Sequence, residues 1–119
     1  MTASLFDKSK LPSRYTTVGP ARAPHRAFLY AMGLSSEEIA QPLVGVASCW
    51  NEAAPCNISL MRQAQVVKKG VAAAKGTPRE FCTITVTDGI AMGHQGMKAS
   101  LASRDLIADS VELTMRGHC

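Results

Sequence analysis

The sequence lacks a long apolar run. No stretch approaches the roughly 20 consecutive apolar residues that cross a bilayer, and the opening segment MTASLFDKSKLPSR has no apolar stretch of the signal-peptide type. The sequence therefore predicts a soluble, cytoplasmic protein with no membrane partner. An organellar transit peptide is the minor alternative, because no acidic residue precedes Asp7 while Lys8, Lys10 and Arg14 follow it.

The cysteines form no Cys-x-x-Cys pair. A self-contained zinc knuckle or redox dithiol is therefore disfavoured, and without a secretory signal two structural disulfides are disfavoured as well. We expect buried thiols, at most one or two of which bind a group that residues elsewhere complete. The four cysteines are Cys49, Cys56, Cys82 and Cys119.

The chain also lacks a basic surface interleaved with aromatic residues. Its net charge is +4 and its pI about 9.1, which allows an anionic substrate. Three lysines share one predicted helix, Lys68, Lys69 and Lys75. Single-stranded nucleic acid needs aromatic rings for stacking beside basic groups. We therefore interpret these lysines as a solvated face and predict no nucleic-acid partner.

The prolines and glycines indicate where regular structure begins. Three prolines and a glycine interrupt residues 1–24, which we predict to be an extended lead-in. Residues 25–119 are predicted to form the amino-terminal portion of one α/β domain. Two short helices are expected at its start, one over 23–32 that ends at Gly33 and one over 35–40 capped by one of its serines.

The remaining pattern alternates strand, helix, strand, helix. LVGVASC (43–49) is short, apolar and partly β-branched, which predicts a strand buried on both faces. An amphipathic helix follows, with Asn57 as its expected N-cap and Gly76 as its stop. FCTITVT (81–87) alternates apolar residues with threonines, which predicts a second strand. Another amphipathic helix is expected after the loop DGIAMGHQGM (88–97).

This order predicts part of a parallel-sheet α/β/α domain with right-handed crossovers. Two strands cannot close such a sheet, because its edges would remain unpaired and its apolar faces uncovered. We therefore expect the 119 residues to be a fragment or a truncated form of a longer chain.

Two loops follow the carboxyl ends of the predicted strands, where ligands bind in open α/β sheets. In the first, Cys56 directly precedes the expected N-cap, where unpaired N–H groups favour a thiolate ligand or nucleophile. A small buried hydrophobe is the alternative for this cysteine. In the second, Asp88 follows the strand as a hard-cation ligand would, or else forms an ordinary turn with Gly89. His94 is more typical of a hydrogen-bonded structural residue than of a base.

Three segments together resemble the dihydroxy-acid and phosphogluconate dehydratase family. They are GVASCWNEAAPCNISL (45–60), TITVTDGIAMGHQGM (83–97) and SRDLIADSVE (103–112), in the order and spacing of that family. The resemblance extends from about Ser13 to Cys119. The opening LPSRYTTVGPARAPHRAFLYAMG and the PCNISL form of the first segment favour the dihydroxy-acid branch.

The resemblance implies one ligand for each of two metal centres. Cys56 matches a cysteine that binds an iron–sulfur cluster, of the 2Fe-2S type in many members, and Asp88 matches an aspartate that binds Mg²⁺. Cys49, Cys82 and Cys119 match no ligand of the family and are expected to be structural. The other ligands and the proton acceptor come from later segments of such enzymes, so no catalytic base is identified in this chain, and substrate-binding residues stay unknown.

The implied activity is dehydration of a 2,3-dihydroxy-3-methyl acid to a 2-keto acid, in the synthesis of valine, leucine and isoleucine. The enzyme is expected to be a homodimer at full length, and this chain is expected to be inactive alone. Two alternatives remain: a sugar-acid dehydratase fragment with the same sites, and a non-catalytic α/β module that binds an anion or a partner.

Overall fold

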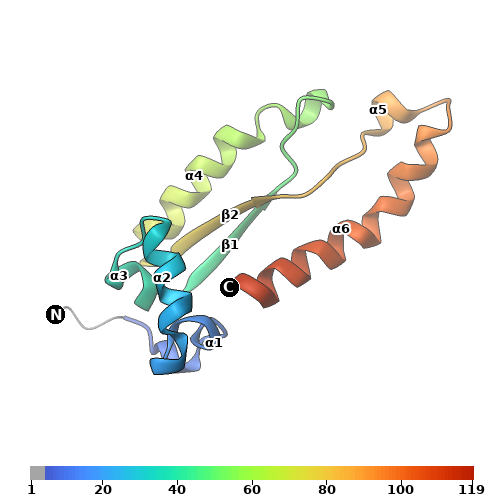
Figure 1. The fold of residues 1–119 in the computed structure, drawn as a ribbon. Coiled ribbons are helices and arrows are strands. Elements are labelled where there is room, and N and C mark those ends of the chain that lie inside the picture. The colour runs from blue at the N-terminus through green and yellow to red at the C-terminus, as the bar shows by residue number, and fades with distance from the viewer. Residues whose placement is uncertain (1–4) are drawn as a thin grey trace.

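The computed structural model describes residues 5–119 and contains two parallel strands flanked by helices (Figure 1). Strand β1 spans Leu43–Ser48 and strand β2 spans Thr77–Cys82. The strands pair in parallel, with Leu43 opposite Thr77 at their amino ends. The predicted α/β class with a parallel sheet is confirmed.

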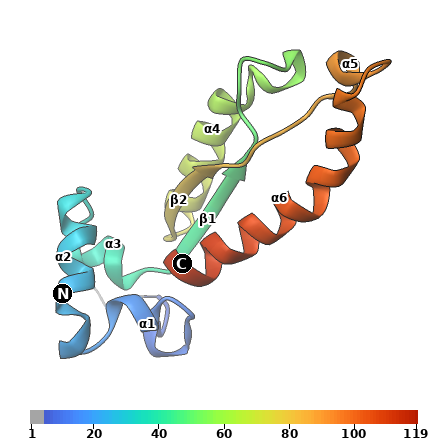
Figure 2. The same cartoon turned by 45° about the vertical axis from the view of Figure 1, so that its right-hand side comes forward.

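Two helices lie on opposite faces of this sheet (Figures 1 and 2). Helix α4 (Leu60–Ala73) crosses from β1 to β2 and contacts both. On its face, a Cβ added to Gly76 would lie 3.1 Å from a methyl group of Val44. The next residue of β1 faces the other way, and a Cβ there would meet the Met115 side chain of α6 (Gly96–His118).

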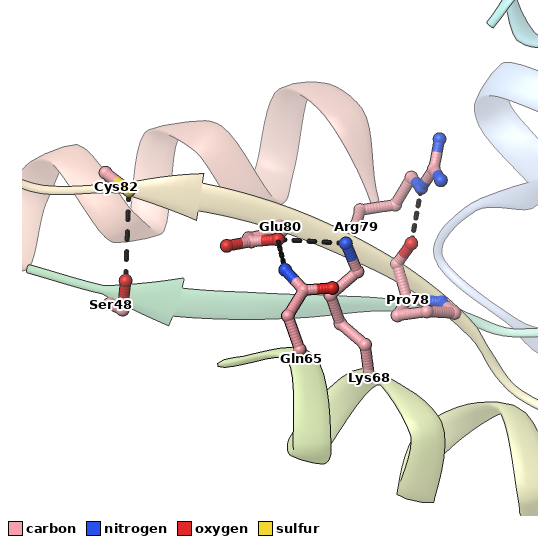
Figure 3. Close-up of polar contacts among 7 residues, drawn as sticks. All are labelled: Ser48, Gln65, Lys68, Pro78, Arg79, Glu80 and Cys82. Carbon is pink, nitrogen blue, oxygen red and sulfur yellow. Dashed lines mark hydrogen bonds and ion pairs between the residues drawn. The ribbon is translucent and has the colours of Figure 1, made fainter. Parts of the chain in front are cut away.

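Polar contacts fasten β2 to α4 (Figure 3). The Glu80 carboxylate accepts a hydrogen bond from Lys68 Nζ at 2.9 Å and one from Gln65 Nε2 at 3.3 Å. Figure 3 shows the neighbouring Arg79 directed away from this group, with its Nε donating to the Pro78 carbonyl oxygen at 2.6 Å. Successive residues of β2 thus serve opposite faces of the sheet.

The described chain is elongated and leaves much apolar surface uncovered. Its radius of gyration is 17.5 Å and its extents are 59 × 27 × 24 Å, whereas a compact chain of this length has a radius of gyration of about 13.5 Å. Phe28 is 73% exposed and Leu113 is 70% exposed. The expectation that two strands leave apolar faces uncovered is confirmed.

Strand β1 shows the same incomplete cover. We predicted it to be buried on both faces, but only Leu43 and Val46 are buried, and Ala47 is exposed. The prediction is wrong because α6 meets this strand through the Met115 side chain of its last turns, close to Gly45, while the rest of the helix runs outward from the sheet (Figure 2).

The lead-in is not extended over its described part. Prolines stop long elements, yet they suit the first turn of a helix, and Pro20 begins such a turn. Residues 1–4 of the predicted lead-in lie outside the described residues. The short helical turns are η1 (Lys8–Lys10), α1 (Arg14–Thr17) and η2 (Pro20–Arg22).

The two short helices that we predicted next are confirmed. They are α2 (Ala23–Ala31) and α3 (Ser36–Ala40). Gly33 follows α2 with a φ of +92°, as a glycine after a helix end commonly does. Ser35 caps α3 in a reciprocal capping box with Glu38.

The second strand lies earlier than predicted. We placed it over 81–87, but β2 covers Thr77–Cys82. Its last residue is opposite Ser48, and Thr83 N–H still donates to the Ser48 carbonyl oxygen at 2.8 Å. Beyond that point β1 has ended, so the alternating residues up to Thr87 have no strand to pair with. No helix between residues 5 and 119 is both long and apolar enough to cross a membrane.

Candidate functional site

The loops that follow β1 and β2 leave the sheet at the same end. The first contains the short helical turn η3 (Pro55–Asn57), and the second leads into helix α5 (Asp88–Ala91). These two turns lie side by side beyond the carboxyl ends of the strands in both views (Figures 1 and 2). The fold therefore places the element that carries Cys56 next to the element that begins with Asp88.

Cys56 lies in a turn of its own and not at the start of a long helix. Helix α4 begins at Leu60, and Ser59 occupies its N-cap position. Our prediction that Asn57 caps this helix is wrong, because the Asn57 amide points back across the loop instead. Cys56 is exposed and free, so the alternative of a small buried hydrophobe does not describe it.

Two asparagines close the loop around Cys56. Asn57 Nδ2 donates to the Cys49 carbonyl oxygen at 2.6 Å and lies 3.0 Å from the Cys49 sulfur. Asn51 Oδ1 accepts from the Ala54 N–H at 2.9 Å. Ala54 and Asn57 are buried on either side of Cys56. The backbone of the loop is thereby fixed, while the thiol between these two anchors faces outward.

Asp88 is the first residue of α5 and is exposed. Its carbonyl oxygen accepts from the Met92 N–H at 2.8 Å, so Asp88 and Gly89 begin a helical turn and the alternative of an ordinary Asp-Gly turn is wrong. The carboxylate oxygen Oδ1 accepts a hydrogen bond from Ser100 Oγ. Oδ2 has no protein partner within residues 5–119, and it is therefore available to a ligand.

His94 has a structural role in the loop between α5 and α6. Its Nδ1 accepts from the Gly96 N–H at 3.0 Å, so its Nε2 carries the proton and donates to the Ile90 carbonyl oxygen at 2.8 Å. A Cβ on Gly96 would lie 2.5 Å from the ring, and Gly93 has a φ of +83°. Both ring nitrogens are occupied, which agrees with the structural interpretation and leaves neither free to act as a base.

Of the other three cysteines, Cys49 lies in the first loop, where Asn57 Nδ2 contacts its carbonyl oxygen and its sulfur. Cys82 ends β2 and Cys119 follows α6, so both lie outside the two loops. All are free, and none is fully buried, which corrects our expectation of buried thiols: Cys82, the last residue of β2, is exposed, and Cys49 and Cys119 are half-buried. Burial raises the pKa of the Cys119 thiol, and nearby Arg79 partly offsets this effect. Residues 5–119 contain no group of three or more His, Cys, Asp or Glu side chains placed to hold a metal ion.

An open cavity of about 700 Å³ lies at the opposite end of the strands. It is lined mainly by α2, by β2 from Pro78 to Phe81 and by the last turn of α6, with His25, Phe28, Arg79 and His118 among its residues. This cavity contains neither Cys56 nor Asp88. Its apolar walls belong to the uncovered surface of the sheet and not to the rim where the two loops meet.

Sequence reasoning missed Asn57 and Ser100 as residues that hold the two loops. The partner of Asn57 lies eight residues earlier and that of Ser100 twelve residues earlier. Asn57 before a helix is the usual sign of an N-cap, and Ser100 has the appearance of any small residue on a helix. Neither feature of the sequence reveals which residue the side chain contacts, because the fold of the loops brings each partner close.

Comparison with known proteins gives a family match and several close relatives. Residues 41–119 match the family described as dihydroxy-acid/6-phosphogluconate dehydratase N-terminal. The chain is 86% identical over its whole length to dihydroxy-acid dehydratase 2 of Mesorhizobium japonicum and covers 20% of that protein. It is 83% identical over its whole length to dihydroxy-acid dehydratase of Parvibaculum lavamentivorans, of which it covers 21%. The chain thus spans about a fifth of the length of these relatives.

Proposed function

The chain belongs to the dihydroxy-acid/6-phosphogluconate dehydratase family, and we propose that it is the amino-terminal part of a dihydroxy-acid dehydratase. The whole enzyme would remove water from a 2,3-dihydroxy-3-methyl acid to give a 2-keto acid, in the synthesis of branched-chain amino acids. The names of relatives at 83 to 86% identity support this branch of the family. We further propose a cytoplasmic homodimer.

Cys56 and Asp88 are proposed to bind the two metal groups of this enzyme. An exposed thiol on a fixed loop suits a 2Fe-2S cluster, because thiolates are the usual cluster ligands. An exposed carboxylate with one open oxygen suits Mg²⁺, which prefers oxygen ligands and takes few of them from the protein. The remaining ligands of each centre would come from other parts of the longer enzyme.

The residues of this chain would hold the two groups at one rim of the sheet. When bound, Mg²⁺ supplies positive charge that acidifies the substrate α-hydrogen, and the cluster supplies a Lewis-acidic iron for the β-hydroxyl. Asn51 and Asn57 fix the backbone that presents the Cys56 sulfur. Ser100 holds one oxygen of the Asp88 carboxylate, which would bind Mg²⁺. We assign no proton acceptor to this chain.

The observation that carries the proposal is the adjacency of η3 and α5 at the carboxyl end of the strands (Figures 1 and 2). Two metals that act on one substrate need ligands from neighbouring elements, and these two elements are neighbours. The family description names two substrate classes, so the test is a comparison of substrates. We expect the anaerobically purified full-length enzyme to dehydrate 2,3-dihydroxyisovalerate and to leave 6-phosphogluconate unchanged.

The opposite preference would identify the sugar-acid branch, with the same metal ligands. Turnover of neither substrate by an enzyme that contains iron and Mg²⁺ would contradict the proposal. It would then favour the non-catalytic module, which binds an anion or a partner without converting it.

A further inference from the structure

The hydroxyl groups of α6 differ in where they donate. Serine and threonine within a helix usually bond to a carbonyl oxygen of the preceding turn. Ser100 instead donates across to Asp88 Oδ1 on another element, and its side chain is buried, with its residue 8% exposed. The hydroxyls that follow the usual pattern in α6 are those of Ser103, Ser110 and Thr114.

The loop between α5 and α6 sets the position from which Ser100 donates. The His94 ring joins the Ile90 carbonyl oxygen of α5 to the Gly96 N–H of α6, at 2.8 and 3.0 Å. Gly96 admits the ring only because it lacks a Cβ. The start of α6 is therefore fixed relative to α5, and Ser100 lies just over one helical turn further along α6.

This arrangement leaves the two oxygens of the Asp88 carboxylate in different states. Oδ1 is held by a neutral donor, and Oδ2 has no partner among residues 5–119. A carboxylate that is free to rotate loses side-chain entropy when it binds an ion. One that is already oriented offers a single oxygen in a fixed direction, and residues that orient metal ligands in this way contribute strongly to metal affinity.

We propose that Ser100 is a positioning residue that orients Asp88 for a divalent cation, by binding Oδ1 and leaving Oδ2 as the single metal-binding oxygen. The inference rests on the proposed function, since it takes Asp88 to be a cation ligand. It assigns no catalytic step to Ser100. Its consequence is that the affinity of the site for the cation depends on a hydroxyl that does not touch the cation.

The test uses the full-length enzyme and Mn²⁺ as the probe, because Mn²⁺ accepts the same oxygen ligands as Mg²⁺ and its free form is measured by electron paramagnetic resonance. We expect Ser100→Ala to raise the dissociation constant of Mn²⁺ roughly 10- to 100-fold. Ser100→Thr keeps the hydroxyl and should restore most of the affinity. Ser100→Cys keeps the shape of serine with a weak donor, and it should resemble the alanine variant.

Ser103→Ala is the matched control. Ser103 is equally buried, at 9% exposure, and lies on the same helix, but its hydroxyl donates to the Ser100 carbonyl oxygen. This control should bind Mn²⁺ as the unaltered enzyme does. Equal weakening in the Ser100 and Ser103 alanine variants would show a general structural effect and would overturn the proposal.

Asp88→Asn separates this inference from the proposed function. If Asp88→Asn greatly weakens Mn²⁺ binding while Ser100→Ala leaves it unchanged, Asp88 is a ligand and the positioning role of Ser100 is wrong. If Asp88→Asn leaves binding unchanged, the ligand assignment and the positioning role both fail. Weakening in both variants, with recovery in Ser100→Thr, is the result that supports the inference.

Discussion

Replacing Asn57 with alanine removes the side chain that closes the Cys56 loop. The Asn57 amide donates to the Cys49 carbonyl oxygen at 2.6 Å, and the other donor to that oxygen is Asn51 Nδ2 at the long distance of 3.4 Å. Asn57 is 7% exposed, so water has little access to take its place. A buried group that loses its partner costs about 1–3 kcal/mol. We therefore expect the free energy of unfolding to fall by about 2 kcal/mol, roughly a 30-fold change in the unfolding equilibrium.

Urea denaturation followed by far-ultraviolet circular dichroism measures this change. Asn57→Asp is the informative second variant, because it keeps the size of the side chain but turns an acceptor toward the Cys49 carbonyl oxygen, and it should be at least as destabilising. Gln63→Ala is the control, since Gln63 is an exposed residue of α4, where substitutions usually change stability by less than about 0.5 kcal/mol. If Asn57→Ala falls within that range as well, Asn57 does not hold the loop.

Three further predictions concern the sheet and the lead-in. Gly45→Ala would bring a Cβ against the Met115 sulfur. Because the flexible Met115 side chain can shift, urea denaturation should show a loss of about 1 kcal/mol, at the lower end of overpacking costs; Met115→Ala in the same chain should recover part of this loss, and simple additivity of the two changes would contradict the contact. Burial lowers the pKa of Lys8 from 10.5 to about 8, so between those pH values the unfolded chain binds more protons and the free energy of unfolding should rise with pH; Lys8→Met should flatten that rise, and an unchanged slope in pH-dependent denaturation would contradict it. Glu80→Gln removes the partly exposed ion pair with Lys68 and should cost less than about 1 kcal/mol, with little remaining difference at high salt; a larger loss in denaturation would show that the pair holds β2 more firmly than its exposure indicates.

Local patterns were sufficient to predict the elements whose signals lie within one turn or one strand. Ser35 and Gly33 mark the start of α3 and the end of α2, and LVGVASC defines β1 within one residue. The parallel α/β arrangement followed from the alternation of strands and helices. These features depend on residues that are close in the sequence, so they can be predicted without knowing the fold.

Features that depend on a distant partner were predicted poorly. FCTITVT has the alternation of a strand, but β2 ends at Cys82 because its partner strand ends at Ser48. Asn57 is a residue type that often caps helices, yet its amide donates to the Cys49 carbonyl oxygen instead. Cys56 and Asp88 were proposed from their places in the loops after the two strands and from the family resemblance, and their role stays a prediction. The contact from Ser100 to Asp88 became visible only when α6 was placed beside α5.

The iron content and visible absorbance of the anaerobically purified full-length enzyme test the account most directly, when Cys56→Ser is compared with Cys82→Ser. Both cysteines are exposed and free, but only Cys56 lies on the rim beside α5. We expect Cys56→Ser to lose the absorbance and iron of the cluster, while Cys82→Ser keeps both. A fully loaded cluster in folded Cys56→Ser would contradict the assignment of this rim as the place where the two metals meet.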